Sequence, residues 1–258
     1  MRIVVKVGTS TLTHETGRMN LRRVQDLCRV IADLKNAGHE MILVSSGAIG
    51  MGIGKLSLRE RPTDIPTKQA AAAVGQCELM DTYDRLFGQY HHTVAQILLT
   101  GADLSHTDRH ENFSNTVSRL LSLGVLPVIN ENDTVATDEI KVGDNDTLSA
   151  LVAVSVKADL LILLSDVDGL YTADPRKSDK AELIREVHGV TDELFARAGG
   201  AGSALGTGGM KTKLQAAKIC ECSGCDVVLM NGATPERLYD AVENKPLNAT
   251  RFYARRDA

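Results

Sequence analysis

Residues 130–146 read Asn130-Glu-Asn-Asp-Thr-Val-Ala-Thr-Asp-Glu-Ile-Lys-Val-Gly-Asp-Asn-Asp146, a polar segment between two apolar ones. The run before it, residues 125–129, predicts a buried strand, and residues 147–156 after it predict a helix. The segment holds six carboxylates and three asparagines. Since ligands of open α/β sheets lie just outside the carboxyl ends of the strands, it is a candidate ligand site. A solvated acidic loop, with Asp144 or Asp146 capping the helix, is the alternative, but capping does not require three Asn-Asp clusters.

Strand and helix patterns alternate along the whole chain. Several strand patterns are continuous Val/Ile/Leu runs, which is typical of strands that helices cover on both faces. The predicted strands span residues 3–7, 41–45, 94–99, 125–129, 160–165 and 226–230. The predicted helices span residues 21–37, 67–90, 111–123, 148–158 and 209–223. This pattern predicts an α/β fold, a three-layer αβα sandwich with a mainly parallel central sheet, in one domain over residues 1–258.

The bulk composition excludes several classes of protein. With 43% hydrophobic and 24% charged residues, the chain is typical of a soluble globular protein. A net charge of -4 and a pI near 6.0 argue against a nucleic-acid-binding protein, which usually presents a basic face. The sequence contains no apolar run long enough to span a membrane and opens on a strand pattern rather than a signal peptide. We therefore expect a cytoplasmic protein.

Five cysteines, an odd number, do not predict a disulfide framework. Cys220, Cys222 and Cys225 lie close together and raise the question of a zinc or iron–sulfur site. Such sites usually need a fourth ligand, and Cys28 and Cys77 fall inside helical patterns that do not supply it. Small buried cysteines at a helix end are the favoured interpretation.

Two glycine-containing turns follow the first two predicted strands. The first is Lys6-Val-Gly-Thr-Ser10, in which Gly8 allows a ligand to approach the backbone and Thr9 offers hydroxyl and amide donors. Lys6 is either a surface lysine or a phosphate contact, and the local sequence leaves both open. The second turn is Ser45-Ser-Gly-Ala-Ile-Gly50, whose small residues open a helix and offer free N–H groups to an anion.

A third glycine-rich turn, Gly206-Thr-Gly-Gly-Met-Lys-Thr-Lys213, opens the last predicted helix. It does not match a P-loop, and no dinucleotide fingerprint follows the first strand. Two lysines in the first turn of a helix oppose the helix dipole, so their cationic charge is more readily explained by a phosphate ligand than by local stability. A flexible hinge before a surface helix is the alternative.

The chain offers positive charge and helix N-termini but no Ser-His-Asp set and no G-x-S-x-G nucleophile motif. Phosphoryl transfer needs mainly positioning and electrostatic stabilisation. A carboxylate acceptor would be ionised at neutral pH and would need no general base. The sequence therefore favours phosphoryl transfer.

Seven motifs together resemble the amino acid kinase family and, within it, its glutamate 5-kinase branch. They occur in the order typical of the family and cover nearly the whole chain. The run from Ile129 to Asp146 and the glycine-rich Met-Lys-Thr-Lys turn are the most specific of them. The motifs are Val5-Lys-Val-Gly-Thr-Ser10, Val44-Ser-Ser-Gly-Ala-Ile49, Lys68-Gln-Ala-Ala-Ala-Ala-Val-Gly-Gln76, Val128-Ile-Asn-Glu-Asn-Asp133, Ile140-Lys-Val-Gly-Asp-Asn-Asp146, Gly169-Leu-Tyr-Thr-Ala-Asp-Pro175 and Gly206-Thr-Gly-Gly-Met-Lys-Thr-Lys213.

The resemblance implies transfer of a phosphoryl group from ATP to the γ-carboxylate of L-glutamate, the first step of proline biosynthesis. Lys6 and Lys213 would neutralise charge on the transferred group, and Asp146 would hold both lysines. The residues expected to bind glutamate are Ser46, Gly47, Asn130, Asp133 and Asn145. The residues expected to bind ATP are Lys6, Gly8, Thr9, Ser165, Asp166, Thr207, Gly208, Gly209, Met210, Lys211, Thr212 and Lys213. Mg²⁺ would be held mainly by the ATP phosphates and not by a protein metal site.

The resemblance also implies an N-terminal lobe that binds glutamate, a C-terminal lobe that binds ATP, and a homo-oligomer. L-proline would act as a feedback inhibitor at the glutamate site, and a glutamyl phosphate reductase would consume the product. Many bacterial members carry a further C-terminal PUA domain of a type otherwise found in RNA-modifying proteins. This sequence stops at Ala258, so we expect the kinase domain alone.

Three other interpretations remain open. A sibling kinase would phosphorylate N-acetylglutamate, aspartate, carbamate or a nucleoside monophosphate, and the 130–146 segment argues against it because the segment matches the glutamate-specific pattern. A non-catalytic nucleotide-binding regulator on the same fold would be expected to lack Lys6, Asp146 or Lys213, and all three are present. An RNA-binding module would need a basic patch or the further domain.

Overall fold

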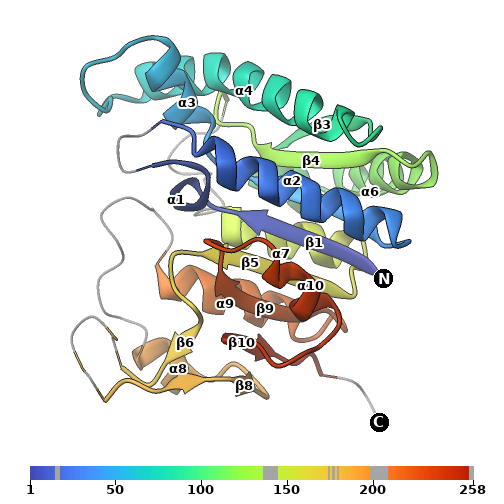
Figure 1. The fold of residues 1–258 in the computed structure, drawn as a ribbon, viewed down its shortest axis with the longest axis vertical. Helices are drawn as coiled ribbons and strands as arrows, with labels where there is room; N and C mark the ends of the chain where they lie inside the picture. Colours follow the sequence, from blue (N-terminus) through green and yellow to red (C-terminus); the bar gives the residue numbers. More distant parts are fainter. Residues whose placement is uncertain are drawn as a thin grey trace.

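The computed structural model describes residues 1–14, 18–135, 145–173, 175, 178, 180–197 and 209–255 (Figure 1). In this part of the chain, eight strands form one sheet in the order β3-β4-β2-β1-β5-β9-β10-β8. The strands in that order are Val94–Leu99, Leu126–Glu131, Glu40–Ser45, Arg2–Val7, Leu160–Ser165, Asp226–Asn231, Ala249–Phe252 and Glu186–Val187. β1 pairs in parallel with β2 on one side and with β5 on the other. β10 runs antiparallel to β9, whereas the other strand pairs of this sheet are parallel. The sheet is therefore mainly parallel.

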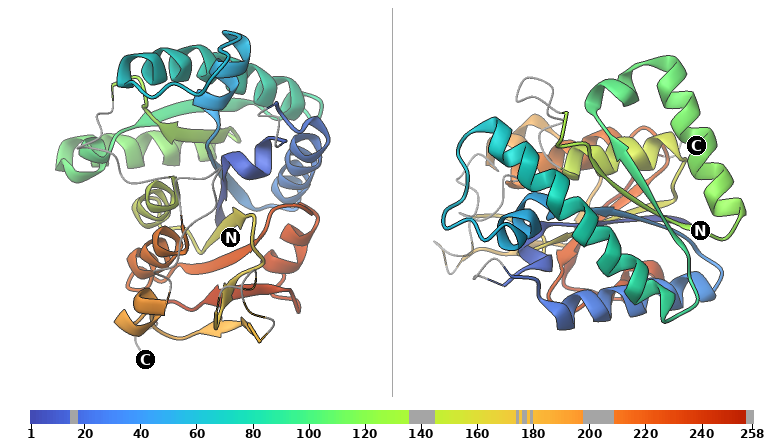
Figure 2. Two further views of the ribbon diagram at one scale, coloured as in Figure 1. Left: turned by 90° about the vertical axis from the view of Figure 1, so that its left-hand side faces the viewer. Right: turned by 90° about the horizontal axis from the view of Figure 1, so that it is seen from above.

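Helices cover both faces of the sheet (Figures 1 and 2). The first face is covered by α2 (Leu21–Asn36), α4 (Ile65–Gly88) and α10 (Arg237–Val242). The second is covered by α6 (Thr107–Ser122), α7 (Asn145–Ser155) and α9 (Met210–Cys220). The described residues therefore form a three-layer αβα sandwich.

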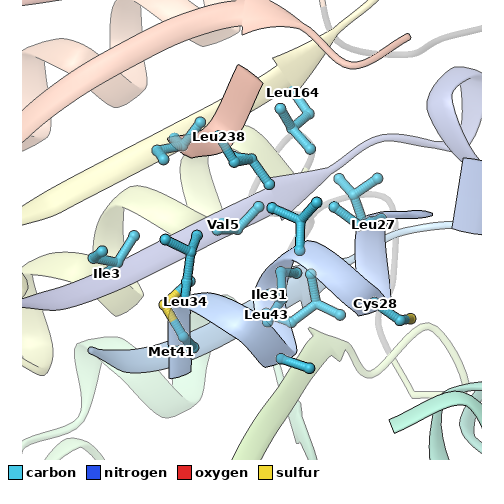
Figure 3. Close-up of a cluster of buried hydrophobic side chains, with 14 of the residues drawn as sticks. Ile3, Val5, Leu27, Cys28, Ile31, Leu34, Met41, Leu43, Leu164 and Leu238 are labelled. Carbon is cyan, nitrogen blue, oxygen red and sulfur yellow. The ribbon is translucent and has the colours of Figure 1, made fainter. Parts of the chain in front are cut away.

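The alternation of side chains along β1 decides which residue faces which layer. Ile3 and Val5 pack into the hydrophobic cluster under α2, shown in Figure 3, whereas Val4 packs into the cluster under α7 and α9. Lys6 is two residues beyond Val4, so its side chain lies on the face that α7 and α9 cover. The period of the first strand thus directs its lysine toward the starts of these two helices.

The remaining elements are short and border the main layers. They are α1 (Thr9–Leu12), α3 (Ala48–Lys55), α5 (Gly101–Ser105), α8 (Asp192–Arg197) and a small hairpin of β6 (Leu170–Tyr171) and β7 (Leu183–Ile184). None of the described helices is long and apolar enough to cross a membrane.

The chain changes direction across the sheet at β1. The strands β2, β3 and β4 extend the sheet on one side of β1, and β5 and β9 extend it on the other. Ligands of open α/β sheets bind at such a reversal, beyond the carboxyl ends of the strands. The turns after β1, β2, β4 and β5 all emerge at this edge, because these strands are parallel.

The predicted α/β fold and its mainly parallel sheet are confirmed. The six predicted strands and five predicted helices are present, with ends shifted by a few residues, as is usual for element boundaries. The prediction did not include the edge strand β8, its neighbour β10 or the helix α10. These elements are two to six residues long, too short to show a clear period.

Candidate active site

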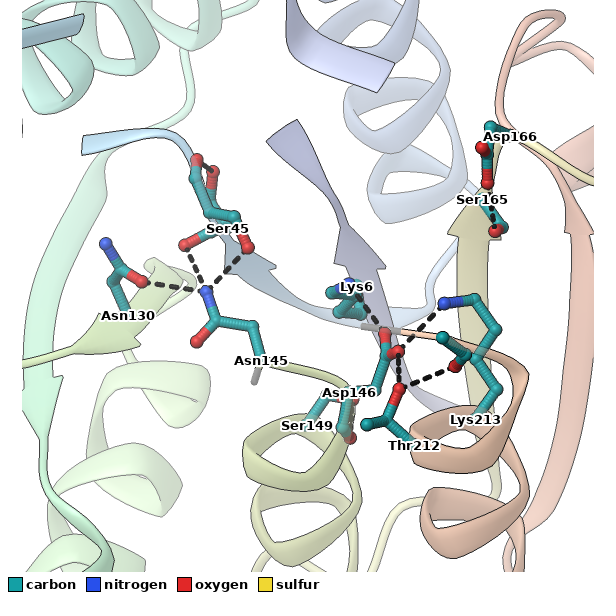
Figure 4. A network of polar contacts seen from close by, with 12 residues as sticks. Lys6, Ser45, Asn130, Asn145, Asp146, Ser149, Ser165, Asp166, Thr212 and Lys213 are labelled. Atoms are coloured by element: carbon teal, nitrogen blue, oxygen red, sulfur yellow. Dashed lines mark hydrogen bonds and ion pairs between the residues drawn. The ribbon is translucent and has the colours of Figure 1, made fainter. Parts of the chain in front are cut away.

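Two lysines contact opposite oxygens of one buried carboxylate (Figure 4). Lys6 Nζ lies 2.6 Å from Asp146 Oδ1, and Lys213 Nζ lies 3.0 Å from Asp146 Oδ2. Asp146 is fully buried, and each lysine is 7% exposed. The three residues come from β1 and from the first turns of α7 and α9, so the fold brings together residues that are far apart in the sequence.

Burial acts against the charge of Asp146, but its partners outweigh burial. Burial alone would raise the pKa of Asp146, whereas the positive charges of Lys6 and Lys213 and their hydrogen bonds lower it. The net result is a pKa well below the ordinary value of an aspartate, so the carboxylate is ionised at neutral pH. Among the described residues, two lysines therefore share this one ionised carboxylate.

The start of α9 adds to this positive potential. The free N–H groups and the dipole of a helix N-terminus favour an anion. Gly209 is the N-cap of α9 and makes no capping hydrogen bond through a side chain. A negatively charged group that enters here meets a buried lysine and helix N–H groups, which is the environment that a phosphoryl group requires.

Thr212 also contacts the shared carboxylate. Its hydroxyl lies 2.9 Å from Asp146 Oδ2 and 2.8 Å from the carbonyl oxygen of Gly209. Asp146 Oδ2 therefore lies within hydrogen-bonding distance of both Lys213 and Thr212, while Oδ1 contacts Lys6 (Figure 4).

A cluster of amide side chains begins at the residue before Asp146 (Figure 4). Asn145 Nδ2 donates toward Ser46 Oγ at 2.8 Å, Asn130 Oδ1 at 2.9 Å and the Ser45 carbonyl oxygen at 3.1 Å. Asn130 is 2% exposed and Asn145 8% exposed. Because Asn145 and Asp146 are consecutive in α7, this cluster and the lysine pair lie side by side.

Two glutamines are hydrogen-bonded in series to the amide cluster. Asn130 Nδ2 donates to Gln76 Oε1 at 3.0 Å, and Gln76 Nε2 donates to Gln96 Oε1 at 3.1 Å. Asn130 Oδ1 also accepts from the N–H of Glu131, so both ends of the Asn130 amide are engaged within the protein. Sequence reasoning assigned no role to Gln76 or Gln96. The signal available in the sequence was a glutamine among the small residues of a predicted helix.

The other expected glutamate-binding residues lie at the same edge of the sheet. Gly47 has φ +108°, which favours glycine, and is the N-cap of α3. Ser46 precedes it and is half-buried. Asp133 lies in a half-buried turn after β4. The structure brings Ser46, Asn130 and Asn145 into one hydrogen-bonded group.

The expected ATP-binding residues fall at three places on this edge. Gly8 and Thr9 form the start of α1 directly after β1. Ser165 ends β5, and its hydroxyl lies 3.2 Å from Asp166 Oδ1. Gly209 to Lys213 form the start of α9, where Lys213 is buried but Lys211 is exposed. Thr207 and Gly208 lie outside the described residues, as do residues 136–144 of the polar segment.

Of the two aspartates that the sequence offers as helix caps, the structure describes only Asp146. Asp144 lies outside the described residues. The carboxylate of Asp146 lies in the first turn of α7, but both of its oxygens contact side chains from other elements. Its carboxylate therefore contacts both lysines.

No group of three His, Cys, Asp or Glu side chains suited to a metal ion occurs among the residues that the structure describes. Cys220 and Cys225 are buried at the end of α9 and the start of β9, as expected, but Cys222 is exposed. A hydrogen bond with Cys220 and burial both raise the pKa of the Cys225 thiol. The prediction of buried cysteines was thus correct for two of the three and wrong for Cys222.

Known proteins that are similar to this chain are kinases, in agreement with the geometry of the site. The model of the amino acid kinase family matches residues 1–231. The chain belongs to the amino acid kinase family. Among curated relatives, the glutamate 5-kinase of Clostridium tetani is 56% identical over 94% of this chain and 91% of the relative. The glutamate 5-kinase of Clostridium perfringens is 51% identical over 99% of this chain and 96% of the relative.

Other curated relatives of this amino acid kinase are longer than the matched region. The glutamate 5-kinase of Caldanaerobacter subterraneus is 58% identical over 90% of this chain but only 62% of the relative. Among solved structures, carbamate kinase from Giardia lamblia bound to AMP-PNP matches with a TM-score of 0.72 at 15% identity, over 98% of both chains. UMP kinase from Ureaplasma parvum matches with a TM-score of 0.66 at 15% identity, again over 98% of both chains. At such identities these two structures establish the shared fold.

The groups at the described site of this family member limit the reactions that it can support. It offers fixed positive charge, helix N–H groups and amide side chains. Its lysines are held by an ionised carboxylate rather than exposed to solvent. This arrangement can bind and stabilise a transferring phosphoryl group beside a polar organic substrate.

Proposed function

We propose that this chain transfers the γ-phosphoryl group of ATP to the γ-carboxylate of L-glutamate and forms L-glutamyl 5-phosphate, the first step of proline biosynthesis. The observation that carries the proposal is the buried contact of Lys6 and Lys213 with the two oxygens of Asp146. Identity above 50% to glutamate 5-kinases over most of the chain supports glutamate as the acceptor.

The lysines act on the charge of the transferred group. In phosphoryl transfer, negative charge is spread over the equatorial oxygens of a loose transition state, and little covalent chemistry is required of the protein. Lys6 and Lys213 contact different oxygens of Asp146, and a phosphoryl group between the two substrates would meet both ammonium groups. Asp146 holds them in place and accepts no proton, because its pKa lies below the ordinary range.

Glutamate fits the amide cluster beside the lysines. The γ-carboxylate is ionised at neutral pH and attacks without a general base. Asn145 directs its Nδ2 into the protein, and its Oδ1 makes no hydrogen bond to the part of the chain that the structure describes. This oxygen, with Asp133, suits the α-ammonium group, while Ser46 and the N–H of Gly47 suit a carboxylate. Asn130 would act mainly by holding Asn145.

ATP would approach from the side of β5 and α9. The residues that support its binding are Gly8, Thr9, Ser165, Asp166 and the N-terminal turn of α9, with Thr207 and Gly208 assigned on sequence resemblance alone. Glutamate would thus lie over the N-terminal part of the domain and ATP over the C-terminal part. Mg²⁺ would be held mainly by the ATP phosphates, as is usual for this ion, and would neutralise part of their charge.

The proposed function has further consequences for partners. L-glutamyl 5-phosphate is an acyl phosphate, so a reductase that uses acyl phosphates would have to consume it promptly. L-proline would compete with glutamate as a feedback inhibitor, which predicts a higher apparent KM for glutamate in millimolar proline. We also propose a homo-oligomer in the cytoplasm.

Two alternative functions would follow from other outcomes. A sibling kinase would use N-acetylglutamate or aspartate as the acceptor on the same lysine arrangement. A non-catalytic nucleotide-binding regulator would bind ATP without turnover. The intact set of Lys6, Asp146 and Lys213 favours catalysis over the regulator.

The test is ADP release from Mg-ATP with L-glutamate, N-acetyl-L-glutamate or L-aspartate as the acceptor. Hydroxylamine is included to trap an acyl phosphate as its hydroxamate. Turnover and trapped product with L-glutamate alone are expected. Turnover with another acceptor would replace the substrate assignment, and ATP binding without turnover on any acceptor would favour the regulator.

A further inference from the structure

The hydroxyl of Thr212 faces two oxygen acceptors. It lies 2.9 Å from Asp146 Oδ2 and 2.8 Å from the carbonyl oxygen of Gly209, and Figure 4 shows it between the two helices. A threonine hydroxyl has a single proton and can donate to one acceptor at a time. A bond to an ionised carboxylate is stronger than a bond to a neutral carbonyl, so Asp146 is the preferred acceptor.

The contact with Gly209 alone would not indicate a function. Threonine side chains in helices commonly donate to a carbonyl three or four residues earlier, and such a bond concerns only the local helix. The contact with Asp146 is different, because it crosses from α9 to α7 and reaches a fully buried anionic oxygen. That oxygen also accepts from Lys213, the next residue along α9.

Among the described residues, three donors are shared unequally between the two oxygens of Asp146. Lys6 contacts Oδ1, whereas Lys213 and Thr212 both contact Oδ2. Two long flexible lysine side chains place little restraint on rotation of the carboxylate about its Cβ–Cγ bond. The β-branched side chain of Thr212 is stiff, so its hydroxyl is a fixed third point that defines the plane of the carboxylate.

We infer that Thr212 is a positioning residue for phosphoryl transfer, which holds Asp146 so that each lysine keeps its own carboxylate oxygen. The inference rests on the proposed function for its kinetic consequence. It goes beyond a contact between Thr212 and ATP, because it assigns the hydroxyl to a protein carboxylate. Loss of the hydroxyl would leave both lysines present but less well placed toward the transferred group.

The kinetic test compares Thr212→Val, which keeps the shape and removes the donor, with Thr212→Ser, which keeps the donor. In Thr212→Val, kcat is expected to fall about tenfold, as for the loss of a hydrogen bond to a charged group, while KM for glutamate changes less than twofold. Thr212→Ser is expected to recover most of kcat. Thr82→Val in α4 is the control, because the hydroxyl of this buried threonine donates within its own helix, to the Glu78 carbonyl oxygen.

A second arm shows whether the effect passes through Asp146. In an Asp146→Asn background, adding Thr212→Val is expected to change kcat by less than twofold, because the shared carboxylate is already absent. Equal fold-losses in the two backgrounds would overturn the inference. So would an unchanged kcat in Thr212→Val, or a Thr212→Ser variant as slow as Thr212→Val. If Thr212→Val does not fold, Thr212→Ala takes its place in each comparison.

A third arm does not require catalysis. The carboxyl ¹³C resonance of Asp146, assigned by its loss in Asp146→Asn, is expected to shift in Thr212→Val and to return toward its original position in Thr212→Ser. An unchanged resonance in Thr212→Val would overturn the contact. Wild-type protein that forms no acyl phosphate on any acceptor would instead overturn the proposed function, and the ¹³C measurement would still test Thr212.

Discussion

Lys6 and Asp146 form a buried ion pair of 2.6 Å, with 8% and 1% of their side chains exposed. Replacing Lys6 by Met keeps most of the side-chain volume and removes the charge. Because the transferring phosphoryl group loses one of two buried cations, kcat is expected to fall at least about a hundredfold. Initial rates of ADP release with saturating Mg-ATP and glutamate measure this effect.

The same substitution is expected to reduce stability. Lys6→Met removes one charged hydrogen bond to the buried carboxylate of Asp146, which keeps Lys213 and Thr212 as partners. We expect the free energy of unfolding to fall by about 1.5 kcal/mol in urea titrations, the lower end for loss of a hydrogen bond to a charged group. Lys157→Met, at an exposed lysine, is the control for both measurements. A Lys6→Met variant with wild-type kcat would contradict the assigned role of Lys6.

The lowered pKa of Asp146 predicts how stability depends on pH. A group whose folded-state pKa lies below its unfolded value contributes stability that is fully present above the unfolded pKa, about 3.9 for Asp. That contribution is lost as the pH falls through the unfolded value toward the folded-state pKa. Stability of wild type relative to Asp146→Asn is therefore expected to be constant from about pH 5 to pH 8 and to shrink below about pH 4.

Urea titrations of both proteins between pH 3 and pH 8 measure this difference. Asp81→Asn, which removes an exposed carboxylate in α4, is the control for both titrations. A wild-type advantage that does not shrink at acidic pH would mean that the lysines do not hold Asp146 in its ionised form.

The orientation of the Asn145 amide predicts a defect specific to glutamate. Nδ2 faces three oxygens, so Asn145→Asp would replace a donor by a negative charge that faces Ser46 Oγ, Asn130 Oδ1 and the Ser45 carbonyl. We expect KM for glutamate to rise at least about tenfold, because buried oxygens lose their donor and the cluster opens. Initial rates at varied glutamate and fixed Mg-ATP measure it.

Asn145→Ala is the companion variant, because it removes the donor without adding charge. Its KM for glutamate is expected to rise less than that of Asn145→Asp. If Asn145→Asp raised KM for ATP and left KM for glutamate unchanged, the amide cluster would belong to the nucleotide side of the site.

The sheet and the edge where the site lies could be predicted from the sequence, whereas the contacts within the site could not. Continuous apolar runs such as residues 160–165 identify strands that are covered on both faces, and parallel strands place their polar turns at one edge. That Lys6 meets Lys213 at Asp146 is a long-range contact that no local period encodes, and here only the family resemblance indicated it. Gln76 was missed because a glutamine in a helix is ordinarily exposed.

The close packing of α3 on α4 was also missed, because it depends on the absence of side chains. A Cβ added to Gly75 would lie 1.8 Å from the carbonyl oxygen of Ala48, and one added to Gly52 would lie 1.8 Å from that of Ala71. Neither contact can be relieved by a side-chain rotation, since both partners are backbone atoms. The two helices therefore approach each other through glycine.

Gly75→Ala is accordingly expected to push α3 away from α4 and to cost on the order of 3 kcal/mol of stability, at the upper end for an overpacked core. Because α3 begins directly after Ser46 and Gly47, the shift also moves the Ser46 hydroxyl away from Asn145, and KM for glutamate is expected to rise. Gly88→Ala is the matched control in the same helix, since a Cβ there meets nothing within 4 Å and alanine favours the helix. Urea titrations and glutamate saturation curves of the two variants measure both effects. Equal stability and equal KM in the two variants would show that α3 adapts without moving the substrate site.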